Sequence, residues 1–193
     1  MVNELRLYTD DELMIRNQGL IKVKKGLESL NINFFLMMGV LLGAVRDKNF
    51  IKWDWDVELG LFTESIVDKV SELKQVFENE NLRFEIVDPT RDGFKINLFY
   101  LQNKYTLWGL CQKGKWLKRN SYKFPMKHFQ TFDDIEFLGE IYKTPNNVEK
   151  LLTYIYGDWQ TPHKTNIKED YLNSRIFNKR PLKERIINKL KLK

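Results

Sequence analysis

Carboxylates recur at every second position of one short segment, at Asp54, Asp56 and Glu58. Alternate side chains of a β-strand point to the same face, so in a strand these three groups would converge on one side. The apolar side chains between them, which we expect in the core, are Trp55, Val57 and Leu59. The spacing therefore predicts a strand over residues 54–61 with one acidic face and one buried face.

Three neighbouring carboxylates repel one another, so the pattern favours a cation bound among them. Hard oxygen ligands suit Mg²⁺ or Mn²⁺, which commonly take one or two carboxylates and complete their shell with water and substrate phosphate. The alternative is an edge strand with a solvated acidic face, since exposed strands often carry charges.

A glycine precedes a predicted helix just upstream of the acidic segment. Gly39 follows the apolar run 34–38, and residues 40–46 are expected to begin a helix whose free backbone N–H groups could bind a phosphate. Arg46 would add a fork of donors, although a lone arginine can equally be a surface residue. A phosphate site followed by a metal-binding strand is the usual construction for phosphoryl or nucleotidyl transfer.

The remaining periodicities predict the elements that position these residues. Helical spacing or strand alternation gives helices over 10–30, 65–78 and 147–156, and strands over 34–38, 82–87, 94–101 and 105–110. The expected architecture is α+β: a small mixed sheet with helices packed on one face and a mostly irregular carboxyl-terminal third.

Length and composition indicate one globular domain. The chain has 193 residues and a hydrophobic content of 42%, and the apolar run 34–45 is shorter than the roughly 20 residues that span a bilayer. Residues 1–4 lack the features of a secretion signal, so we expect a cytoplasmic protein. Cys111 stands alone, which excludes an internal disulfide. His128 and His163 are interpreted as ordinary surface or loop residues.

The formal charge of +6 resides in the last 15 residues, because 179–193 contain seven Lys and Arg side chains and one Glu. We therefore divide the chain into a catalytic domain, 1–178, and a basic amphipathic tail, 179–193. The tail could contact an anionic membrane at the inner face, or dock as a solvated terminal helix. Nucleic-acid binding is not expected, since no aromatic-rich basic groove is evident.

Residues 39–46 and 50–60 together resemble the signature of the LicD/fukutin-type phosphotransferases, a branch of the nucleotidyltransferase fold. Later segments are similar to further landmarks of that family in the same order. They are 124–125, 132–139, 142–145 and 152–162. The resemblance covers about 13–165 and leaves the basic tail outside.

The resemblance implies transfer of phosphocholine or an alditol phosphate such as ribitol phosphate. The donor would be CDP-linked, and the acceptor a hydroxyl of a glycan or glycolipid, as in lipopolysaccharide, capsule or teichoic acid synthesis. Carried over by position, Asp56 and Glu58 would bind Mg²⁺ or Mn²⁺, with Asp54 the preceding acidic residue. Gly39 and the helix start would hold donor phosphate, and Arg46 would neutralise it.

Two positions depart from the family pattern. Asn97 stands where a third carboxylate is expected, and an amide can ligate metal but cannot accept a proton. Val40 replaces a small hydroxyl residue, which removes one phosphate donor from the proposed cofactor-binding set, and Lys95 could compensate. Either Asp54 supplies the base, or the acceptor reacts without one, or activity is weak. Two alternatives stay open: a nucleotidyltransferase that modifies protein or RNA, and an inactive nucleotide- or partner-binding protein.

Overall fold

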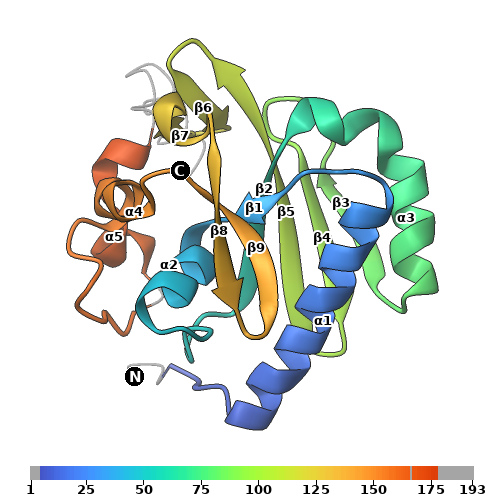
Figure 1. Ribbon diagram of the computed structural model, residues 1–193, viewed down its shortest axis with the longest axis horizontal. Coiled ribbons are helices and arrows are strands. Elements are labelled where there is room, and N and C mark those ends of the chain that lie inside the picture. Colours follow the sequence, from blue (N-terminus) through green and yellow to red (C-terminus); the bar gives the residue numbers. More distant parts are fainter. Residues whose placement is uncertain (1–4, 166, 178–193) are drawn as a thin grey trace, which may run out of the picture.

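The computed structural model describes residues 5–165 and 167–177, and within them it builds an α+β fold around one mixed sheet (Figure 1). The spatial order of the strands is β1-β2-β5-β4-β3, with β6 and β7 continuing from β5. The strands are β1 (Phe35–Leu36), β2 (Asp56–Phe62), β3 (Arg83–Asp88), β4 (Lys95–Tyr100), β5 (Asn103–Lys113), β6 (Trp116–Arg119) and β7 (Tyr122–Pro125).

The pairing of β2 with β5 is parallel, and the other described pairings of this sheet are antiparallel. In the register, Asp56 lies opposite Lys104 and Glu58 opposite Thr106. Thr106 in turn lies opposite Asn97 of β4. Because paired residues project to the same face of a sheet, these five polar side chains share one face of three adjacent strands.

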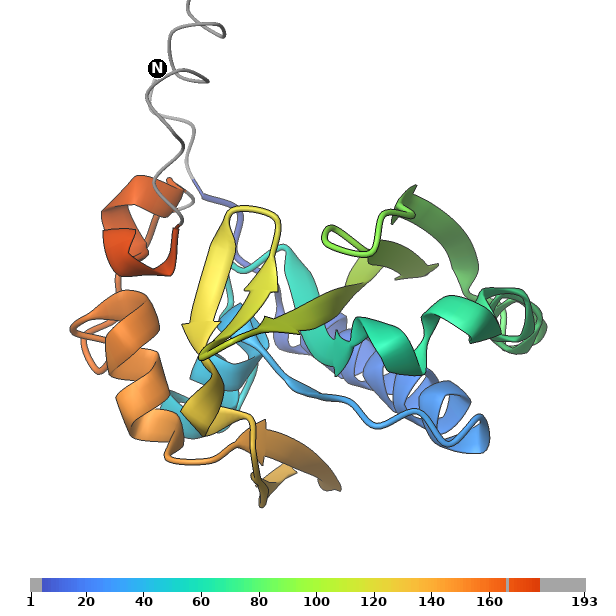
Figure 2. The same ribbon diagram turned by 90° about the horizontal axis from the view of Figure 1, so that it is seen from above.

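Helices lie towards both ends of the sheet. Figure 2 shows α1 and α3 towards one end of the sheet and α4 and α5 towards the other. Their bounds are α1 (Asp10–Ser29), α2 (Met38–Arg46), α3 (Val70–Asn79), α4 (Val148–Tyr156) and α5 (Lys168–Tyr171). Short 3₁₀ turns are Thr63–Ser65, Val67–Lys69, Met126–His128 and Ser174–Ile176.

The longest helix, α1, covers the apolar face of the sheet. Thr9 caps it through a reciprocal pair of hydrogen bonds with Glu12, which satisfies backbone donors at the helix start. Its own residues Leu20, Val23 and Leu27 are fully buried. The Tyr105 hydroxyl of β5 donates a 2.7 Å hydrogen bond to the Arg16 carbonyl of α1, which fixes the helix against the central strand.

Most predicted elements are present, with corrections both near the site and away from it. β1 has two residues, and α2 starts at Met38, so Gly39 lies inside its first turn and not before it. β2 starts at Asp56, so Asp54 and Trp55 precede the strand, and Trp55 is 56% exposed instead of packing in the core. The segment after residue 130 is less irregular than predicted.

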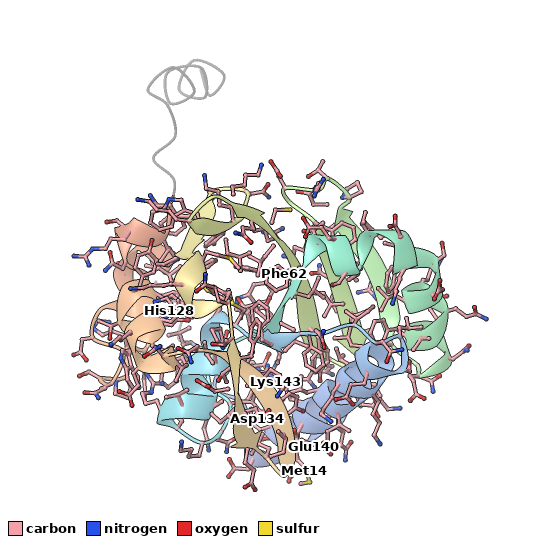
Figure 3. The ribbon with its side chains drawn as sticks, turned by 45° about the horizontal axis from the view of Figure 1, so that its top comes forward. Met14, Phe62, His128, Asp134, Glu140 and Lys143 are labelled. Atoms are coloured by element: carbon pink, nitrogen blue, oxygen red, sulfur yellow. The ribbon has the colours of Figure 1, made fainter. Side chains whose placement is uncertain are left out.

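That later segment contains a two-stranded hairpin of β8 (Phe132–Phe137) and β9 (Glu140–Pro145), which packs beside β1. Figure 3 labels Asp134 and Lys143 on its two strands, where they form a 2.7 Å ion pair. His128, also labelled there, is buried, and its Nδ1 lies 3.0 Å from the Asn146 carbonyl oxygen. His128 therefore lies in the connection between β7 and β8, but it is buried and not at the surface.

Candidate active site

The acidic residues of β2 face the polar side of the sheet, as their spacing predicted. Asp56 is 6% exposed, and its Oδ2 lies 3.5 Å from Lys104 Nζ and 3.2 Å from Thr106 Oγ1. Lys104 also lies over the Trp55 ring, 4.0 Å from its centroid. Lys104 and Thr106 were not identified from the sequence. Their alternation along β5 is the signal that could have found them.

Asp54 lies in the turn before β2 and is held from the opposite side of the fold. Its backbone N–H donates to the Ile51 carbonyl, and its own carbonyl accepts a 2.7 Å hydrogen bond from Arg16. The Arg16 guanidinium is buried, bonds Asn103 and stacks on Tyr8. The helical spacing of Arg16 from Leu13, on the buried face of α1, is the signal in the sequence that could have indicated this role.

The Asp54 carboxyl group is close to both Gly39 and Asp56. Burial, reinforced by the negative charge of Asp56, raises the pKa of Asp54 to about 7. A Cβ built on Gly39 would lie 1.8 Å from Asp54 Oδ2, so only glycine leaves room for this carboxylate. The preceding residue, Met38, has φ 49°, a left-handed conformation that costs energy for a side chain of its size.

These contacts concern the phosphate site that was predicted at Gly39 and the start of α2. The space beside the Gly39 Cα is filled by Asp54, which gives this glycine a role that the sequence did not suggest. The Val40 side chain is buried in the core, 2% exposed, and does not line the site. The use of this helix start for phosphate stays a prediction.

The two predicted cationic residues line the same pocket from different elements. Arg46 ends α2 and makes two contacts with the Asp47 carboxylate, at 2.7 and 2.8 Å, and one with the Trp159 carbonyl at 3.3 Å. It lies roughly 10 Å along the helix from Gly39, at 1.5 Å per residue. Lys95 projects from β4, and burial together with the positive charges of Lys104 and Arg119 lowers the pKa of its amine.

The pocket in front of the acidic residues has a volume of about 280 Å³. Gly39, Arg46, Asp54, Asp56, Glu58 and Lys95 all line it, whereas Val40 and Asn97 do not. A further part of its lining comes from the end of α4 and the segment that follows it, which the sequence did not indicate as part of the site. This wall of the pocket includes Tyr156, Asp158, Trp159, Thr161, His163, Thr165, Asp170 and Tyr171. His163 is thus a pocket residue as well as a loop residue.

Two tyrosines of this wall have pKa values that are raised by burial and by nearby carboxylates. Burial, followed by the charges of Glu58 and Asp54, raises the pKa of Tyr156 well above its usual range. The pKa of Tyr171 is raised for the same reasons. Their rings are stacked, with centroids 6.3 Å apart. Both hydroxyls therefore stay protonated at neutral pH and can donate hydrogen bonds towards an anionic ligand.

The carboxylates do not form a ready-made metal cage. Among the described residues, no group of three or more His, Cys, Asp and Glu side chains is placed to hold an ion. Mg²⁺ needs no such cage, because it commonly uses one or two carboxylates together with substrate phosphate and water. Asp54 and Asp56 are close enough for one charge to raise the pKa of the other. This donor set fits a metal that is shared with a phosphorylated ligand.

Comparison with known proteins assigns the family. Residues 31–147 match the family model described as LicD/FKTN/FKRP, nucleotidyltransferase domain. The chain belongs to this family. The match spans α2, the acidic strand and the rest of the sheet, so the resemblance seen in residues 39–60 is confirmed.

The similar curated proteins are much longer than this chain. Ribitol 5-phosphate transferase FKRP of Mus musculus is 28% identical over 145 residues, which cover 68% of this chain and 29% of that protein. Ribitol-5-phosphate transferase FKTN of Macaca fascicularis is 26% identical over 151 residues, 73% of this chain and 32% of that protein. The chain thus spans about three tenths of the length of these relatives.

A solved structure supports the fold. The solution structure of the antibiotic-resistance factor ANT(2'')-Ia has a TM-score of 0.53 and 15% sequence identity, and the match covers 82% of this chain and 80% of that one. At this identity the likeness concerns the fold alone, and the predicted α+β, nucleotidyltransferase-like architecture is confirmed. No helix among the described residues is long and apolar enough to cross a membrane.

Proposed function

We propose that this protein is a metal-dependent phosphotransferase. It would move an alditol phosphate, such as ribitol phosphate, or phosphocholine from a CDP-linked donor to a hydroxyl of a glycan or glycolipid. The observation that carries the proposal is the pocket of about 280 Å³ that joins Asp54, Asp56 and Glu58 to two cationic side chains. These five residues all lie within the family-matched residues 31–147. The names of the relatives favour ribitol phosphate as the transferred group.

The proposed roles follow from where each side chain lies. Asp56 and Glu58, with Asp54 beside them, would hold Mg²⁺ or Mn²⁺, which when bound neutralises charge on donor phosphate. Arg46 and Lys95 line the pocket and would contact further phosphate oxygens. Arg46 must exchange its contacts with Asp47 for the ligand.

Aromatic side chains of the pocket offer a place for the non-phosphate parts of the donor. Trp108 and Trp159 line the pocket, while Trp116 does not. Flat aromatic surfaces contact bases and sugars with little loss of side-chain freedom. Because Asn97 cannot accept a proton, Asp54 is the proposed base for the acceptor hydroxyl, which must approach within hydrogen-bond reach of that carboxyl.

Calorimetric titration of CDP, with and without magnesium, tests the proposal. The native protein should bind CDP more tightly with the metal present, and Asp56→Ala should lose that dependence. Asp134→Ala is the matched control, because Asp134 is an aspartate paired with a lysine on the β8–β9 hairpin, outside the pocket. Equal CDP binding by the native protein and Asp56→Ala would contradict the site.

Product analysis separates the proposed reaction from nucleotidyl transfer. With CDP-ribitol or CDP-choline and a soluble glycan acceptor, we expect release of free CMP. Retention of the nucleotide on a protein or RNA would favour the alternative enzyme class. Absence of both products, with CDP still bound, would favour a nucleotide-binding protein without activity.

Peripheral membrane contact through 179–193 and a cytoplasmic location are part of the same proposal. The tail lies outside the described residues, so this part rests on its sequence alone. Removal of 179–193 should weaken association with vesicles that contain anionic lipid and spare turnover of a soluble acceptor. Unchanged vesicle binding would contradict the assignment.

A further inference from the structure

Asn97 does not line the pocket, although it occupies the strand position where a third carboxylate was expected. It is 8% exposed, and its side chain lies against Thr106 of β5, which is fully buried. Thr106 Oγ1 is 3.3 Å from Asn97 Oδ1 and 3.2 Å from Asp56 Oδ2. The threonine hydroxyl therefore lies between the amide and the carboxylate.

The number of protons decides how these three groups can bond. A hydroxyl has one proton and can donate to only one of its two neighbours, and the charged carboxylate is the stronger acceptor. The oxygen and nitrogen of an asparagine amide are assigned from the hydrogen-bond network. In the structure the Asn97 Oδ1 faces the Thr106 hydroxyl. With the amide in the reverse orientation, its NH₂ would donate to the hydroxyl, and the hydroxyl would donate to Asp56 Oδ2. An aspartate at this position, when ionised, could not make the first bond.

Lys104 contacts the same oxygen of Asp56 as Thr106 does. Lys104 Nζ lies 3.5 Å from Asp56 Oδ2, the atom that Thr106 also approaches. Protein groups thus engage Oδ2 from β5, and these contacts do not involve Oδ1. Partners of this kind orient a ligating side chain and tune its affinity for a cation.

We propose that Thr106 is a positioning residue that passes a hydrogen bond from Asn97 to Asp56 and so holds the Asp56 carboxylate with its other oxygen available to a cation. Asn97 acts through Thr106 and is not itself a metal ligand or a base. The inference rests on the proposed function, because it takes Asp56 as part of the cation site. It also explains why an amide can stand at position 97 in an active enzyme.

Magnesium affinity measured by calorimetry on the full chain, with CDP present, tests the inference. Thr106→Val, which removes the hydroxyl, should weaken magnesium binding about ten-fold or more. Thr106→Ser should remain close to the native protein, since it keeps the hydroxyl. The control is Thr144→Val on β9, which removes the hydroxyl of another buried threonine outside the pocket and should leave affinity unchanged.

The combination of two substitutions separates positioning from direct ligation. Asn97→Ala should weaken magnesium binding in the native background and cause no further loss when Thr106 is already valine. An equal loss in both backgrounds would show that Asn97 contacts the ion directly and would overturn the inference. Native affinity in Thr106→Val would overturn it as well.

A measurement of unfolding keeps this test independent of the proposed function. The coupling between Asn97→Ala and Asp56→Ala, measured as the change in the unfolding equilibrium constant in urea, should be about five-fold with Thr106 present. It should vanish with Thr106→Val, and a coupling that persists would refute the relay. If the native protein binds no magnesium with CDP, the proposed function fails, while this coupling still decides whether Thr106 links the two residues.

Discussion

The two faces of β2 and β5 differ in almost every property, although they are made by alternate residues of the same strands. On one face, Val57 and Leu107 are buried, and the Tyr105 hydroxyl donates a hydrogen bond to the backbone of α1. On the other, Asp56 and Thr106 lie in a polar network behind the pocket. One residue along a strand thus separates a side chain that stabilises the fold from one placed for chemistry. We expect substitutions on the first face to change stability, and those on the second to change binding and turnover.

Asp56→Ala should produce the largest functional effect. With the carboxylate removed, we expect turnover of the CDP-linked donor to fall by about 100-fold or more, as for loss of a group that stabilises transition-state charge. The free energy of unfolding should change by less than about 1 kcal/mol, because the change also relieves repulsion with Asp54. Steady-state kinetics check the predicted loss of turnover, and urea unfolding checks the predicted change in stability. Normal turnover would contradict the assignment of the polar face.

Leu107→Ala tests the opposite face, one residue from Thr106. Leu107 is fully buried, so the cavity left by truncation should lower the free energy of unfolding by about 2–5 kcal/mol. CDP affinity of the folded protein should change little. A large loss of affinity with unchanged unfolding would show that the two faces are not separate in function.

Arg16→Met tests the residue that connects the faces. Arg16 belongs to α1, yet it donates to the Asp54 carbonyl at 2.7 Å and bonds Asn103 at 3.1 Å. Loss of these buried bonds should lower the free energy of unfolding by about 1–3 kcal/mol and weaken magnesium-dependent CDP binding, because the Asp54 turn loses its anchor. Arg16→Lys retains the charge and serves as the comparison. Unchanged CDP binding by Arg16→Met would mean that the turn is held without it.

Gly39→Ala should have the smallest effect on stability, but it should weaken magnesium-dependent CDP binding. Alanine favours a helix over glycine by about 1 kcal/mol, but the new Cβ would lie 1.8 Å from Asp54 Oδ2 and must displace that carboxylate. We expect weaker magnesium-dependent CDP binding with little change in thermal unfolding. Native affinity would show that the position of Asp54 does not matter for the cation.

Much of the site followed from local pattern. The period-two acidic run identified Asp56 and Glu58 as neighbours on one face of a strand, because side-chain alternation depends only on the backbone. The same rule misplaced Trp55 and put Asp54 on the strand, since the sequence does not show that the strand begins at Asp56. Strand boundaries depend on where pairing with β5 begins, which is a long-range property.

The residues that the sequence did not reveal come from distant parts of the chain. Thr106 reaches Asp56 across 50 positions, and Arg16 reaches Asp54 across 38. The aromatic wall at 156–171 faces the acidic strand only because α4 follows the β8–β9 hairpin back towards the site. The sequence pattern of those segments does not predict which part of the protein they will pack against.

The family, the mixed α+β fold and the acidic strand could be predicted from local alternation, helical spacing and a recognisable signature in residues 39–60. Three contacts became evident in the folded chain alone: Gly39 makes room for Asp54, Arg16 anchors the Asp54 turn, and Asn97 contacts Thr106 without lining the pocket. The physical reason is that these contacts depend on the register of neighbouring strands and on the docking of α1, and both are set by packing between residues far apart in the chain.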